Sequence, residues 1–168
     1  LVVLIIAAVM AVGSGLLGTS IAMLGDMTDS ISLYLNRAGA GWPANTGIRT
    51  PTQVEPLAGG FVEMDNEDVA VYSAYGAKIR TIQPGYARPA LAVGNTRFVL
   101  YNRAGKELTV QSRTRQLYAK SFNNAIMLCE MAQNGTLAVV TESDRYAAEV
   151  MVYDASFSGD PFTWKLTS

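Results

Sequence analysis

The residues best suited to chemistry form a short run, Asp144-Arg145-Tyr146, which lies between two predicted strands. Arg145 could bind a carboxylate or a phosphate through two parallel hydrogen bonds. The alternative is a structural turn, in which Asp144 accepts backbone N–H bonds and Arg145 packs over Tyr146 or pairs with a neighbouring β unit. We favour the turn, and the same two interpretations apply to Arg97, which precedes a central strand. All four residues are candidates for an interaction site or for a brace between β units.

A second group of polar residues is acidic and comprises Glu63, Asp65, Glu67 and Asp68. A calcium-binding loop needs alternating Asp or Asn residues, then a Gly and a distal Glu, and this cluster lacks that pattern. We therefore predict a solvated hairpin turn here and no metal site.

Histidine is absent from the whole sequence, and Cys129 is the single cysteine. No imidazole is available as a general base or zinc ligand, which excludes Ser-His and Cys-His nucleophilic pairs and the usual catalytic zinc sites. Cys129 follows Ile-Met-Leu, which predicts a buried small hydrophobic residue. We predict no catalytic residue, no cofactor and no enzymatic activity. These predictions do not cover a site in further blades.

The overall charge also limits the class of partner. The net charge is −1, only 16% of residues are charged, and no basic run occurs. Nucleic-acid binding depends on a positively charged surface that neutralises phosphates, so we predict no nucleic-acid partner.

The first 24 residues, Leu1–Leu24, contain no charged residue. At about 1.5 Å per residue, such a helix spans roughly 36 Å, enough for the hydrocarbon core of a membrane of about 30 Å. We predict a single transmembrane helix over residues 1–25 that attaches the chain to the cytoplasmic membrane, with the C-terminal domain outside. A cleaved signal peptide is the alternative, but its apolar region is usually shorter.

Residues 26–53 are rich in Gly and Pro after Arg37 and show no periodicity, which predicts a juxtamembrane linker. Trp42 lies far from the predicted membrane helix, so we expect it to pack on the outer domain rather than at the bilayer surface.

Residues 54–168 consist of short β-prone runs separated by turn residues. They divide into three units, about 54–84, 85–122 and 123–168, and each unit holds four runs. The predicted strands are Val54–Leu57, Phe61–Met64, Val69–Tyr72, Lys78–Ile82; Ala90–Val93, Phe98–Tyr101, Glu107–Val110, Gln116–Lys120; Ile126–Met131, Thr136–Thr141, Ala148–Tyr153 and Phe162–Leu166.

The units start roughly 36 residues apart, close to the period of about 40 that is typical of β-propeller blades. The central strands are apolar on both faces, as expected of sheets stacked between neighbours, whereas a sandwich would alternate more strictly. Asn134-Gly135 predicts a two-residue hairpin with positive φ at both positions. We therefore predict an all-β fold of propeller-like blades with four antiparallel strands. Three blades do not close a ring, so we expect an incomplete propeller with further blades beyond Ser168.

Four stretches carry a resemblance to a known group of proteins. They are Pro56-Leu57-x-Gly59-Gly60-Phe61, Pro84-Gly85-Tyr86 with Pro89, Gly94-Asn95-x-Arg97-x-Val99-x-Tyr101 with Gly105-Lys106, and Asn134-Gly135-Thr136 through Ser143-Asp144-Arg145-Tyr146. The chain resembles an uncharacterised bacterial domain-of-unknown-function family. The resemblance implies a single-pass, membrane-anchored, extracytoplasmic β-propeller of the WD40/PQQ-like kind and implies no activity.

Three functions remain open, of which the third, assembly of a membrane complex, rests on analogy of fold alone. The first is an extracytoplasmic interaction module that binds a protein or a cell-envelope component. The second is a small-ligand sensor or a PQQ-like oxidoreductase that uses the central channel of the propeller.

Overall fold

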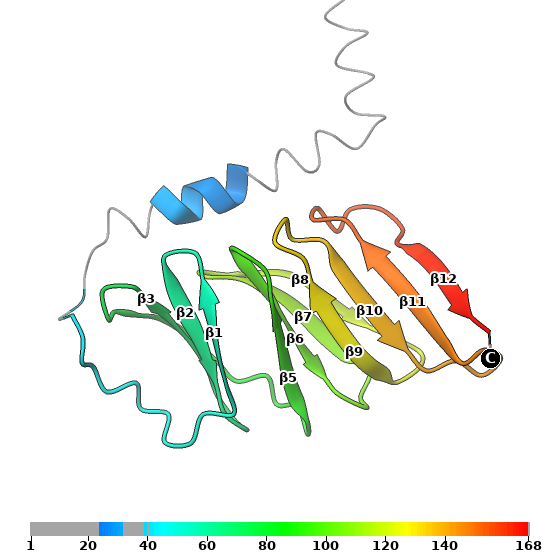
Figure 1. Ribbon diagram of the computed structural model, residues 1–168, viewed down its shortest axis with the longest axis horizontal. Helices are drawn as coiled ribbons and strands as arrows, with labels where there is room; N and C mark the ends of the chain where they lie inside the picture. The colour runs from blue at the N-terminus through cyan, green and yellow to red at the C-terminus, as the bar shows by residue number, and fades with distance from the viewer. Residues whose placement is uncertain (1–23, 32–38, 40, 168) are drawn as a thin grey trace, which may run out of the picture.

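The computed structural model describes residues 24–31, 39 and 41–167. This part of the chain is all-β apart from one short helix, and its strands form three four-stranded antiparallel sheets. The sheets stand side by side in chain order, like consecutive blades of a propeller (Figure 1). The prediction of all-β, blade-like units is therefore confirmed.

Strands that are consecutive in sequence are neighbours in every sheet, because each connection is a short antiparallel turn. The first sheet contains β1 (Gln53–Leu57), β2 (Gly60–Met64), β3 (Val69–Ser73) and β4 (Lys78–Ile82). The second contains β5 (Pro89–Val93), β6 (Arg97–Asn102), β7 (Glu107–Ser112) and β8 (Gln116–Ser121). The third contains β9 (Ile126–Met131), β10 (Leu137–Thr141), β11 (Ala148–Tyr153) and β12 (Phe162–Leu166). All predicted strands are present, with ends that differ by no more than two residues.

Strand register assigns the side chains to two faces of each sheet, since directly opposed residues of neighbouring strands point to the same side. We call the face turned toward the next sheet in the chain the forward face, and the opposite one the backward face. The forward face of β1–β4 packs on the backward face of β5–β8. This cluster includes Val62, Met64, Val69 and Val71 from the first sheet and Leu91, Phe98 and Leu100 from the second.

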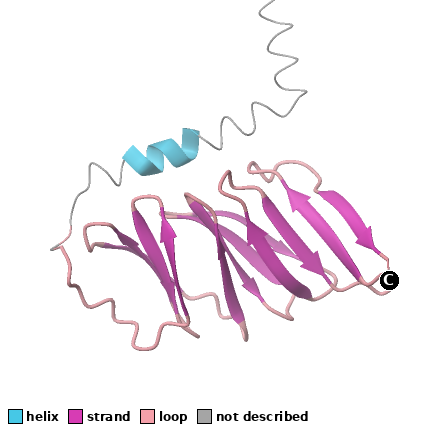
Figure 2. Cartoon of the chain, viewed as in Figure 1, coloured by secondary structure: helices cyan, strands magenta, loops and turns pink. Residues whose placement is uncertain are grey.

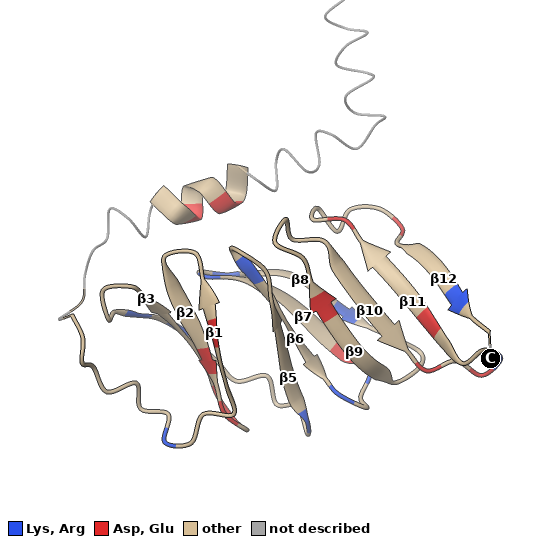
Figure 3. Cartoon of the chain, in the orientation of Figure 1, with Lys and Arg blue, Asp and Glu red and all other residues tan. Residues whose placement is uncertain are grey.

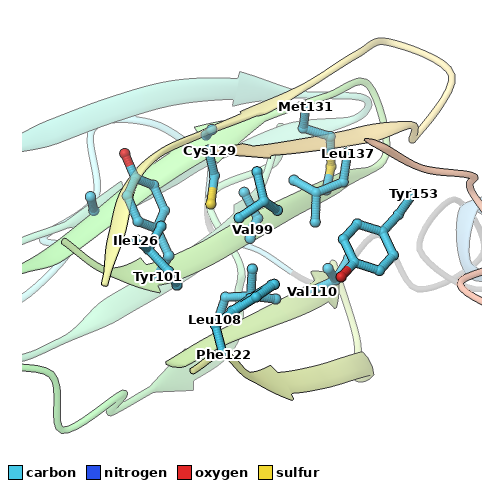
Figure 4. Packing of buried hydrophobic residues seen from close by; sticks show 13 residues of the cluster. Val99, Tyr101, Leu108, Val110, Phe122, Ile126, Cys129, Met131, Leu137 and Tyr153 are labelled. Carbon is cyan, nitrogen blue, oxygen red and sulfur yellow. The ribbon is translucent and has the colours of Figure 1, made fainter. Parts of the chain in front are cut away.

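A larger apolar cluster fills the interface between the second and third sheets (Figure 4). The forward face of β5–β8 supplies Val99, Tyr101, Leu108 and Val110, and the backward face of β9–β12 supplies Cys129, Met131, Leu137, Val139 and Tyr153. Cys129 is buried, as predicted, and burial raises the pKa of its thiol to about 12. A thiol with this pKa is protonated at neutral pH and therefore a poor nucleophile.

The turn between β9 and β10 differs from the prediction. The ladder ends at the pair Met131–Leu137, and the Ala132 N–H donates to the Thr136 carbonyl across a longer loop. Gly135 has φ +85°, but Asn134 does not have a positive φ. The prediction of a two-residue hairpin with positive φ at both positions is therefore wrong. The Asn134 side chain accepts a hydrogen bond from the Thr136 N–H instead. A turn followed by one left-handed residue is the usual longer solution for a hairpin.

The chain itself covers Phe61 and Tyr72 on the backward face of the first sheet. Trp42 packs against Phe61 and Tyr72, with ring centroids 5.4 and 6.3 Å away, and its indole N–H donates to the Ala74 carbonyl. The Tyr72 hydroxyl donates to the carbonyl of Thr46. Trp42 therefore packs on the β domain, as predicted.

Residues 24–31 form the short helix, which lies across one end of the sheets (Figure 2). In the part of the chain that the structure describes, no helix is long and apolar enough to cross a membrane. The predicted membrane helix falls almost wholly on residues 1–23, which lie outside the described residues.

Two leucines of the third sheet test how much the packing between sheets contributes to stability. Leu137 is fully buried against the second sheet, whereas Leu128 is 47% exposed on the forward face. We expect Leu137→Ala to lower the free energy of unfolding of the chain by about 2–5 kcal/mol, the usual cost of a cavity. Leu128→Ala, the matched control, should change it by less than about 0.5 kcal/mol.

Urea unfolding followed by circular dichroism measures both values. Equal losses for the two variants would contradict the assignment of Leu128 to an exposed forward face.

Candidate functional site

The helix of residues 24–31 is held to the sheets by charged and polar side chains that come from separate strand ends. The Asp26 carboxylate accepts hydrogen bonds from Arg97 Nε at 3.0 and 2.8 Å and from Thr96 Oγ1 at 2.8 Å. Arg97 lies at the start of β6 and is only 5% exposed. A terminal nitrogen of Arg97 also donates to the carbonyl of Ala155, in the β11–β12 turn. Arg97 thus joins the helix, the second sheet and the third sheet.

Arg113 makes the equivalent connection to the first sheet. It follows β7, is 3% exposed, and donates to the carbonyl of Ala58 in the β1–β2 turn at 2.6 Å. Its other terminal nitrogen donates to Ser30 Oγ at 2.7 Å and to the Asp26 carbonyl at 3.3 Å. Burial lowers the pKa of the Arg113 guanidinium, and the nearby charges of Asp29 and Asp26 oppose that shift.

We call this group, Asp26, Asp29, Ser30, Arg97 and Arg113, the clasp. Figure 3 shows acidic residues on the short helix and basic residues at the strand ends beneath it. Asp26, Asp29 and Ser30 recur at helical spacing and so share one face of the helix. The clasp fixes the helix over the turns of all three sheets.

The inner strands of the three sheets border an open cavity of about 420 Å³. Its polar lining includes Gln53 and Glu55 of β1, Arg103 after β6, and Glu130 of β9. The Gln53 amide donates to the Leu91 carbonyl and accepts from the Leu91 N–H, both at 3.2 Å, which ties β1 to β5. In a closed propeller, these strands would face the central channel.

A second open cavity, of about 380 Å³, lies between the second and third sheets near their outer strands. Its charged and amide groups come from Lys120, Asn123, Asn124, Asp144 and Glu149. The Lys120 ammonium lies 5.4 Å from the centre of the Tyr153 ring, within the range of a cation–π contact.

The third feature is an apolar surface, the forward face of β9–β12. Register places two rows of side chains on it: Leu128, Val140, Val150 and Trp164, and then Glu130, Ala138, Val152 and Phe162. Phe162 is 70% exposed and Trp164 is 64% exposed. We call this surface the open face, because no described residue covers its two aromatic side chains.

The four predicted site residues do not come together. Arg97 belongs to the clasp, and Asp144 lines the outer cavity. Arg145 is exposed in the β10–β11 connection. Tyr146 is half-buried, and the ammonium of Lys165 lies 5.2 Å from its ring centre. Arg97 is the one of the four whose hydrogen bond to another sheet is described above, to the Ala155 carbonyl.

Sequence reasoning missed the other clasp residues. Arg113 follows a strand, where most arginines are exposed, and nothing local distinguishes it. The spacing of Asp26, Asp29 and Ser30 was a usable signal, because it places three polar groups on one helical face. Of the four acidic residues predicted to form a solvated turn, Asp65, Glu67 and Asp68 do so in the β2–β3 turn, where Asp65 accepts from the N–H groups of Glu67 and Asp68. The prediction is wrong for Glu63, which lies in β2 and is only 6% exposed. These two bonds lower the Asp65 pKa, the one from Asp68 most. The described residues contain no group of metal-ligating side chains.

Comparison with known proteins gives a family match and several similar structures. The model of a family described as a family of unknown function (DUF5711) matches residues 43–160. Comparison with curated proteins found no match.

The similar structures share parts of the fold. The WD40 domain of Neurospora crassa Pan2 is 11% identical, with a TM-score of 0.46 and coverage of 68% of this chain and 36% of that chain. A putative exported protein from Bacteroides fragilis is 18% identical, with a TM-score of 0.46 and coverage of 72% and 38%. A europium-containing methanol dehydrogenase is 10% identical, with a TM-score of 0.37 and coverage of 68% and 25%. The chain spans less than two fifths of the length of each.

The clasp can be tested by removing one charge. We expect Arg97→Gln to lower the free energy of unfolding by about 3 kcal/mol, because Asp26 would be left partly buried without its cation. The value falls at the low end for such pairs since Asp26 keeps 20% exposure. Amide hydrogen exchange in residues 24–31 should also become faster.

Arg145→Gln removes the same charge from an exposed position and serves as the control, with an expected change below about 0.5 kcal/mol. Unchanged exchange in residues 24–31 of the Arg97→Gln protein would show that the clasp does not hold the helix.

Proposed function

The chain belongs to the family of unknown function DUF5711, and from that premise we propose that it is a membrane-anchored, extracytoplasmic interaction module. In this proposal its blade-like sheets bind a protein or another component of the cell envelope. The observation that carries the proposal is the open face, an apolar surface that extends across all four strands of the third sheet.

Exposed apolar surfaces of this kind mark binding sites. A soluble domain rarely leaves a contiguous apolar patch in water, and aromatic residues are enriched where proteins meet. Phe162 and Trp164 provide two aromatic side chains, and Val140, Val150 and Val152 provide aliphatic area between the strands. These residues are suited to a protein partner better than to a small polar ligand.

The membrane attachment rests on the uncharged stretch Leu1–Leu24. The clasp begins two residues later, at Asp26, and holds residues 24–31 against the sheets. A membrane helix in that stretch would therefore have little flexible chain between it and the blades. The open face would be presented at a fixed orientation to the membrane.

Fractionation of cells that produce the chain tests the anchor. We expect the chain to stay with membranes after an alkaline carbonate wash and to be digested when protease is added to wall-free cells. A variant that lacks residues 1–23 should leave the membrane fraction. Recovery of the complete chain as a soluble, protease-protected cytoplasmic protein would refute the proposal.

A second function is favoured by the cavity at the inner strands, which suits a small polar ligand or a cofactor in a propeller channel. A thermal-shift screen with sugars, quinones and Ca²⁺ tests it. Bound ligand raises the melting temperature because it stabilises only the folded state. Glu55→Gln should reduce such a shift, whereas Glu149→Gln, in the outer cavity, should not. Flat melting temperatures would eliminate this alternative.

A further inference from the structure

The open face has a counterpart inside the molecule, because the first two sheets also have forward faces. We propose that the open face binds the backward face of a further four-stranded antiparallel sheet of the same blade type. This inference rests on the proposed function in one respect only: it names the partner of the same surface.

The central strands show the correspondence. In the first sheet, the forward positions of β2 and β3 are Val62, Met64, Val69 and Val71. In the second, the forward positions of β6 and β7 are Val99, Tyr101, Leu108 and Val110. All eight side chains are no more than 3% exposed, because the next sheet covers them. The equivalent positions in β10 and β11 are Ala138, Val140, Val150 and Val152, which are also apolar.

The outer strands show how such a face reaches its partner. Arg80 of β4 crosses the first interface and donates to Gln111 Oε1 at 3.0 Å. Tyr118 of β8 crosses the second and stacks on Phe157, with ring centroids 4.9 Å apart. Trp164 and Phe162 occupy the equivalent forward positions of β12. They have the length to insert into the outer part of a following sheet.

The partner's surface follows from the two backward faces that are already covered. Both present large apolar side chains from their first two strands: Leu91, Phe98 and Leu100 in the second sheet, and Met131 and Leu137 in the third. The partner should have an apolar centre of this type. It should also offer a hydrogen-bond donor or a basic side chain opposite the exposed Glu130.

A second copy of the chain fits this surface less well. Its first sheet would have to supply the backward face, and that face is covered by Trp42 on Phe61 and Tyr72. Head-to-tail stacking of two copies would require these contacts to be displaced. The partner is therefore a blade-type sheet whose backward face is free.

Photocrosslinking of the complete chain in the cells that produce it tests the inference. Benzoylphenylalanine in place of Trp164 should crosslink to a peptide that, in the structure of the purified complex, belongs to a four-stranded antiparallel sheet. The same group in place of Val54, which is 55% exposed on the backward face of β1, is the control. It should not crosslink to that sheet.

The purified complex provides a second measurement. Trp164→Glu should weaken binding of the partner at least about 30-fold, because loss of an aromatic anchor is among the most costly interface changes. Val54→Glu should leave the affinity unchanged. Both positions are exposed, so neither variant is expected to misfold in isolation.

Three results would overturn the inference: a crosslink from position 164 to a second copy of the chain, a crosslink to lipid, or no crosslink. Mixing isotopically labelled and unlabelled chains identifies a crosslink between two copies. Failure of the proposed function would give results that differ from these three crosslinking outcomes. An envelope partner captured only from position 55, in the inner cavity, would preserve the proposed function and refute this partner for the open face. A crosslink from position 164 to a four-stranded sheet, in a chain that fractionates as soluble, would support this inference and refute the proposed function.

Discussion

Each sheet of this chain carries apolar side chains on both faces, and such a sheet is stable in water only when both faces are covered. The first sheet is covered by the second sheet on one side and, over Phe61 and Tyr72, by Trp42 on the other. The second lies between its two neighbours. Among the described residues, the third is covered on its backward face alone, so the unmet part of the constraint is concentrated on the open face.

The clasp has a different structural role from the apolar interfaces between the sheets. Full burial of one Leu or Val side chain contributes about 1.5–3 kcal/mol, and each interface between sheets buries several. A buried ion pair contributes little net stability, because desolvation offsets the attraction, although breaking it is costly. The pair of Arg97 and Asp26 therefore does more to position the helix than to stabilise the fold. With Arg113, it connects one short helix to the turns of three sheets.

Local sequence patterns were sufficient to predict the strands, but they did not predict the long-range contacts. Turn residues and short apolar runs predicted the β strands, because hairpins are formed by neighbours in sequence. The loop at Asn134-Gly135 was mispredicted, since its length depends on where the ladder ends at Met131 and Leu137. The partners of Arg97 could not be predicted from local patterns either, because Asp26 is 71 residues away in the sequence.

The sequence by itself determined the repeated four-stranded units and the apolar character of both their faces, because both properties depend on residues a few positions apart. It also placed Arg97 and Asp144-Arg145-Tyr146 at strand ends, without indicating which would meet. The tertiary structure decided that Arg97 is buried in the clasp and that Arg145 faces water. It also decided which apolar face remains open, because burial depends on how the sheets stack, and stacking joins residues that are distant in the chain.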